Sequence, residues 1–124
     1  MRLEQLQAAL DLVELPADMP TQAPTLHIRD IAFSRHISRC TYAMGKTTLA
    51  HAHAKRNTKH RGWICFSYLG LAQSNDDCLR SLAHELAHLY KPGLRHDSPE
   101  FQAAMKLFEA KLGVSDQPGW GLQE

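Results

Sequence analysis

Cysteine is scarce in this chain of 124 residues, which has three cysteines and no CxxC pair. Cys40, Cys65 and Cys78 are odd in number and widely spaced, which argues against both a disulfide framework and a cysteine-rich zinc site. We therefore expect three reduced, buried thiols.

Long apolar runs and a strong net charge are also missing. No stretch of about 18 apolar residues could span a membrane, and no signal peptide pattern is present. The net charge of +1 is far from the basic balance of a dedicated nucleic-acid binder. We expect one monomeric domain over residues 1–124, soluble and cytoplasmic, with no membrane association; nucleoid or nuclear association is the alternative.

Histidine carries the clearest signal, in the segment HELAH at residues 84–88. Residues four apart lie on one face of a helix, so His84 and His88 can bind one ion. Glu85 then lies beside the ion, where a general base for a zinc-activated water is needed. The alternative is two exposed or hydrogen-bonded histidines on an amphipathic helix.

Flanking residues place this motif inside a helix of about 15 residues. Ser74 with Asp77 reads as a capping box, and Pro92-Gly93 reads as the stop. On a helical wheel the apolar residues form one broad arc, made of Cys78, Leu79, Leu82, Ala83, Leu86, Leu89 and Tyr90. Ser81, His84 and His88 fall on the opposite side, which predicts that one face anchors the helix and the other offers two imidazoles.

A catalytic zinc ion usually takes three protein ligands and leaves one position open. The Pro92-Gly93 break lets the chain turn back toward the ion, which makes His96 our predicted third ligand. Glu100 and Glu109, on the next predicted helix, are the rival ligands, because zinc accepts carboxylates as well as imidazoles.

The stretch HELAHLYKPGLRHDSPEF, residues 84–101, resembles the SprT-like zinc metallopeptidases, which include the Spartan-type proteases. It is also similar to the related WLM and DUF45 hydrolases, and Ser38-Arg39-Cys40 with Gly45 loosely resembles the strand region before their zinc helix. The resemblance implies Zn²⁺ held by His84, His88 and His96, with Glu85 as the catalytic base.

Two departures from the family pattern limit this resemblance. Asp97 stands where SprT-like proteins commonly have glycine after the third histidine. The chain also has no C-terminal zinc ribbon, so we expect a minimal form whose targeting function is absent or supplied by another protein.

The remaining segments predict an α+β, zincin-like fold. A small, mostly antiparallel three-stranded meander would pack against the HExxH helix, with strands at residues 26–38, 46–54 and 63–69. Flanking helices are expected at residues 3–15 and from residue 98 to Gly113, the second opened by a capping box of Asp97 and Glu100. A proline-rich connector at 16–25 and a tail at 114–124 complete the chain.

One predicted loop concentrates positive charge in Lys55, Arg56, Lys59 and Arg61. It could be a solvated loop, or it could contact nucleic-acid phosphates with Trp63 stacking on a base. A third interpretation is a second metal site at His51 and His53, on one face of the preceding strand.

Together these features predict a zinc metalloprotease that hydrolyses peptide bonds with a zinc-activated water and Glu85 as general base. Protein or peptide substrates are expected, and the resemblance adds DNA-associated proteins. The alternative is a non-catalytic, zinc-stabilised module that binds nucleic acid or protein.

Overall fold

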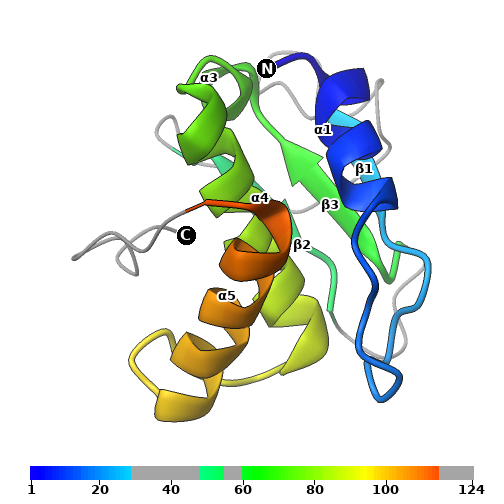
Figure 1. The fold of residues 1–124 in the computed structure, drawn as a ribbon, viewed down its shortest axis with the longest axis vertical. Coiled ribbons are helices and arrows are strands. Elements are labelled where there is room, and N and C mark those ends of the chain that lie inside the picture. Colours follow the sequence, from blue (N-terminus) through cyan, green and yellow to red (C-terminus); the bar gives the residue numbers. More distant parts are fainter. Residues whose placement is uncertain (29–47, 55–59, 115–124) are drawn as a thin grey trace.

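The structure is a computed structural model, and it describes residues 1–28, 48–54 and 60–114 (Figure 1). These residues form four helices and a three-stranded sheet, which confirms the predicted α+β class. The elements are α1 (Leu3–Asp11), β1 (Thr25–Ile28), β2 (Ala50–Ala52), β3 (Trp63–Phe66), α3 (Tyr68–Leu71), α4 (Asn75–Tyr90) and α5 (Pro99–Leu112).

Several predictions fall outside the described residues. These are the strand residues 29–38 and 46–47, the segment from Ser38 to Gly45 with Cys40, the basic residues Lys55, Arg56 and Lys59, and the tail from residue 115. In the described part, Cys65 and Cys78 are buried thiols, as predicted. None of the described helices has the length and apolar character needed to cross a membrane.

The sheet is mixed, and the predicted antiparallel meander is wrong. Its strand order is β1-β3-β2, with β1 parallel and β2 antiparallel to β3. Side-chain alternation along a strand indicates which residues share a face but not which strand lies next to it. The last strand in sequence therefore lies between the two earlier ones.

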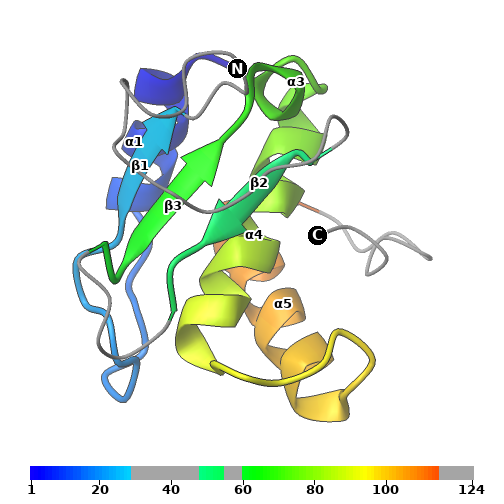
Figure 2. The ribbon, with the colours of Figure 1, turned by 180° about the vertical axis from the view of Figure 1, so that it is seen from behind.

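The helices α1 and α4 pack on one face of this sheet, and Figure 2 shows the sheet in front of them. Ala50, Ile64 and Phe66 point to this face and join the hydrophobic core with residues of α4 such as Leu82. Alternation sends the intervening residues of β2 and β3 to the opposite face.

The third strand ends earlier than predicted, because residues 68–71 form the short helix α3 instead of continuing to Leu69. Ser67 caps this helix by accepting a hydrogen bond from the Gly70 amide at 3.0 Å. The Ser67 hydroxyl also donates to the Thr48 carbonyl at 2.7 Å. A Cβ atom at Gly70 would lie 2.1 Å from the Leu49 carbonyl oxygen, so only glycine allows this close approach.

The first helix is also shorter than predicted, ending at Asp11 instead of Leu15. Leu6 and Leu10 are buried, whereas Leu12, directly after the helix, is 89% exposed. Proline at 16 also disfavours helical geometry at the residue before it. The connector that follows contributes Met19 to the core.

Candidate metal centre

Helix α4 carries the HELAH segment, and its ends are where the sequence places them. The Ser74 hydroxyl accepts a hydrogen bond from the Asp77 amide at 3.2 Å, which caps the first turn. The helix ends at Tyr90, and Gly93 adopts a φ of +80°, a conformation that glycine adopts without steric cost. The predicted start, stop and length are therefore confirmed.

Part of the face of α4 that carries the histidines is covered by protein, a feature that the helical wheel does not address. Ser81 and His84 are 3% and 1% exposed. Helix α5 packs along this side, with the Phe101 ring centroid 5.2 Å from that of His84. The Gln73 amide nitrogen donates to the Ser81 hydroxyl at 3.0 Å. A wheel drawn for one helix cannot show that a second helix covers its polar side.

Three histidines converge between α4 and the start of α5. One ring nitrogen from each of His84, His88 and His96 lies within 4.8 Å of the other two. The Nε2 atoms of His88 and His96 are 3.0 Å apart, and the ring centroids of His84 and His96 are 4.7 Å apart. The structure thus brings the three predicted ligands together.

This spacing fits a tetrahedral metal ion. With metal–nitrogen bonds of about 2.0–2.1 Å, as for zinc, two imidazole nitrogens on one ion lie roughly 3.3–3.4 Å apart. The 3.0 Å between the Nε2 atoms of His88 and His96 needs only a shift of a few tenths of an ångström to match. The cluster could therefore hold one metal ion.

The cluster is buried on one side and accessible on the other. His84 is enclosed, whereas His88 and His96 are half-buried. Beside His96 a pocket opens to solvent, lined by Leu94, Arg95, His96 and Asp97. Of the three histidines, His96 is the one that lines this pocket.

Several contacts hold the loop that presents His96. The Gln102 side-chain amide donates to the His96 carbonyl oxygen. The Ser98 amide donates to the Arg95 carbonyl at 3.1 Å. The Phe101 ring lies against all three histidine rings, at centroid distances of 5.2, 4.7 and 5.3 Å. The first turn of α5 thus positions the third histidine.

The predicted capping box of Asp97 and Glu100 is wrong. Ser98 is the residue directly before helix α5, and its hydroxyl accepts from the Phe101 amide at 3.2 Å. Asp97 instead pairs with Arg95 at 3.5 Å, with both side chains exposed. Pro99 at the first helical position fixes this start, and Gly113 closes the helix as predicted, with a φ of +77°.

The two rival ligands lie apart from the histidine cluster. Glu100 is exposed on the first turn of α5. Glu109 is buried, at 2% exposure, near the other end of the same helix. Among the described residues, the group that could hold the ion contains no carboxylate. The structure therefore favours His96 over both glutamates.

Glu85, the predicted general base, follows His84 directly on α4. Its side chain is 3% exposed, so it sits in an environment largely without water. Successive residues on a helix are rotated by about 100°, which puts this carboxylate beside the histidine face and not on it. The role of Glu85 as general base stays a prediction.

A second cluster combines His51, His53 and Cys65. The two histidines match one of the interpretations drawn from the sequence, whereas Cys65 was missed. Cys65 lies beside His51 because β2 pairs with β3, and these two residues are partners in that pairing. No spacing along the chain reveals that pairing, because 13 positions of intervening sequence separate the two residues.

The described part of the basic loop consists of Arg61, which is exposed. Trp63 beside it stacks on His27 at 3.6 Å and contacts His60 at 4.2 Å between ring centroids. Burial, followed by the charge of His60, lowers the pKa of His27 below its ordinary value of 6.5. Contact of this loop with nucleic acid stays a prediction.

Comparisons with models of protein families, with curated proteins and with solved structures find no match for this chain. The resemblance to SprT-like metallopeptidases therefore remains an expectation from residues 84–101. The function has to be argued from the cluster itself.

Proposed function

We propose that this protein is a zinc-dependent metallopeptidase in which His84, His88 and His96 hold Zn²⁺ and Glu85 is the general base. The observation that carries the proposal is the approach of three imidazole nitrogens to within 4.8 Å of one another; Glu85, which follows His84 along α4, is buried. Three protein ligands leave the open position that catalytic zinc sites need. A structural site would normally be closed by a fourth protein ligand.

The ion, when bound, would polarise the scissile carbonyl and lower the pKa of an attacking water. Glu85 accepts the proton that this water loses as its oxygen bonds to the carbonyl carbon. As the carbon–nitrogen bond breaks, Glu85 delivers that proton to the leaving nitrogen. The three histidines must be neutral to act as ligands, because a protonated imidazole has no lone pair to offer.

The described sheet supports an extended protein or peptide as the substrate. Strand β2 lies at one edge of this sheet, and α4 packs against it. An extended chain can add to such an edge through backbone hydrogen bonds, which would tolerate many sequences. The resemblance to Spartan-type proteases extends this proposal to DNA-associated proteins.

The test is the substitution Glu85→Gln, compared with Glu100→Gln as a matched control on an exposed glutamate. We expect Glu85→Gln to keep the zinc content of the parent and to lose cleavage of an unfolded protein by about 10²–10⁴-fold, the range for a general base. Glu100→Gln should keep both. Zinc is measured by elemental analysis and cleavage by the appearance of new amino termini.

Equal cleavage by Glu85→Gln and the parent would remove Glu85 as the base. If the zinc-loaded parent cleaves neither a DNA-bound protein nor the same protein without DNA, the protease proposal fails. A zinc-stabilised binding module would then be the better account. The comparison of bound with unbound protein also shows whether DNA promotes cleavage.

A further inference from the structure

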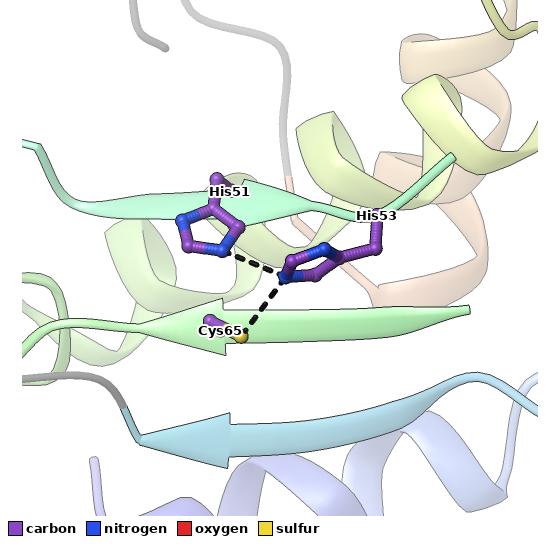
Figure 3. Close-up of side chains that lie close together, drawn as sticks. All are labelled: His51, His53 and Cys65. Atoms are coloured by element: carbon purple, nitrogen blue, oxygen red, sulfur yellow. Dashed lines mark hydrogen bonds between the residues drawn. The ribbon is translucent and has the colours of Figure 1, made fainter. Parts of the chain in front are cut away.

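The cluster of His51, His53 and Cys65 lies in the sheet, apart from the HELAH segment (Figure 3). The Nε2 atoms of His51 and His53 are 2.9 Å apart. The Cys65 sulfur lies 3.5 Å from the Nε2 atom of His53. Figure 3 shows the two rings and the thiol pointing toward one another from neighbouring strands.

This cluster faces away from the hydrophobic core. Ile64 and Phe66, on either side of Cys65, pack in that core, so alternation points the Cys65 thiol to the opposite face. His51 is its partner in the antiparallel pairing of β2 with β3. His53 follows two residues later and shares that face. The cluster therefore lies across the sheet from the three histidines of α4 and α5.

The cluster is also largely buried, with His51 at 6% and Cys65 at 0% exposure. A thiol and two imidazoles are the ligands that zinc and related d-block ions prefer, whereas magnesium and calcium select oxygen. One ligand atom from each of the three residues lies within 4.8 Å of the other two, as in the cluster of His84, His88 and His96.

The sulfur–nitrogen distance fits a tetrahedral ion of this class, whereas the 2.9 Å between the Nε2 atoms of His51 and His53 has to widen by roughly 0.4 Å for two imidazoles to share one ion. For metal–nitrogen bonds of about 2.0–2.1 Å and a metal–sulfur bond of about 2.3 Å, nitrogen and sulfur on one ion lie roughly 3.6 Å apart. The structure has 3.5 Å between the Cys65 sulfur and His53. The His60 ring lies outside this group, with its centroid 5.8 Å from that of His53.

We propose that His51, His53 and Cys65 form a second metal site for a thiophilic divalent d-block cation of the zinc class. The site cross-links β2 to β3 and is separate from the proposed peptidase chemistry. Two of its ligands come from β2 and the chain directly after it, and the third comes from β3. A bound ion would therefore fix the strand pairing that places β2 beside α4.

Cobalt(II) tests this proposal, because cobalt bound to a thiolate gives an intense charge-transfer absorption in the near ultraviolet. Cobalt on imidazoles alone gives only weak visible bands. Adding cobalt to the metal-free protein should produce the thiolate band with two ions bound per chain. Cys65→Ser should abolish the band and reduce the stoichiometry to one ion. His53→Gln, at a half-buried position, should weaken the band as a second variant.

Two controls separate this site from the first. Cys78→Ser removes a thiol that is also buried, and it should leave the band unchanged. His88→Ala should remove one of the two ions but keep the band. Absence of the band in the parent, or its persistence in Cys65→Ser, would overturn the proposal. Neither result bears on cleavage by the parent, so the two proposals fail independently.

Discussion

His96 is the residue on which the three-histidine cluster depends most, because it alone comes from outside α4. We predict that His96→Ala weakens zinc binding by more than about 100-fold, since even partners outside the ligand set typically change metal affinity 10–100-fold. Glu109→Ala should bind zinc like the parent. Zinc affinity is measured by competition with a chromophoric chelator in the Cys65→Ser background, which removes a ligand of the proposed second site. Normal zinc binding by His96→Ala would remove this residue from the site.

His27 gives a pH dependence to stability. Its pKa is lowered by burial and, to a smaller extent, by His60, so the folded chain binds this proton less readily than the unfolded chain. The stability from His27 is therefore present above the ordinary pKa of 6.5 and lost as the pH falls below it.

The substitution His27→Gln should reduce this loss of stability at low pH. We expect the melting temperature of the metal-free parent to fall between pH 7.5 and pH 5 by more than that of His27→Gln. Thermal unfolding followed by circular dichroism at both pH values provides the measurement. Identical changes in the two proteins would show that His27 does not contribute.

At the same scale, the sequence predicts the residues that lie close together along the chain. The spacing of His84, Glu85 and His88 fixes their place on one helix, and Pro92-Gly93 allows His96 to return. Cys65 could not be predicted in the same way, because its place beside His51 depends on which strands pair. Local spacing therefore predicts the first cluster but only two of the three residues of the second.

Among the elements, the turn between α4 and α5 decides whether the third histidine reaches the first two. Gly93 has a φ of +80°, and no atom lies within 4 Å of where its Cβ would be. A side chain at this position is therefore disfavoured by the backbone conformation and not by a clash with neighbouring atoms.

We predict that Gly93→Val weakens zinc binding by about 5–30-fold, the equivalent of roughly 1–2 kcal/mol for a left-handed conformation that a β-branched residue disfavours. Gly93→Asn is the matched control, because asparagine tolerates this conformation. Zinc affinities of the two variants and the parent can be compared in one competition assay. Equal affinities would show that the turn does not hold His96 in place.

The elements themselves differ in how well the sequence predicts them. Helices α4 and α5 begin and end within a residue or two of prediction, because Ser74, Gly93, Pro99 and Gly113 carry strong local signals. The strands are predicted less well, since β3 ends at Phe66, directly before the serine that caps helix α3. No local sequence pattern indicates that β1 pairs in parallel with β3, because the packing of the whole chain determines which strands are neighbours.

At the scale of the whole molecule, the described fold places two candidate metal sites on opposite sides of one sheet. Helix α4 packs on the core face and shares the first cluster with the start of α5. The second cluster occupies the other face and ties β2 to β3. A metal ion there would stabilise the strand against which α4 packs. Both sites would then stabilise the same fold, although only the first is proposed to be catalytic.

The proposed activity requires three imidazoles that hold a zinc ion with one position open, and X-ray absorption at the zinc edge measures this ligand set. The sample is the Cys65→Ser chain with one equivalent of zinc, which removes the sulfur of the second site. We expect three imidazole nitrogens and one oxygen at about 2.0–2.1 Å from the zinc ion. A spectrum with fewer than three imidazoles, or with a sulfur ligand, would contradict it.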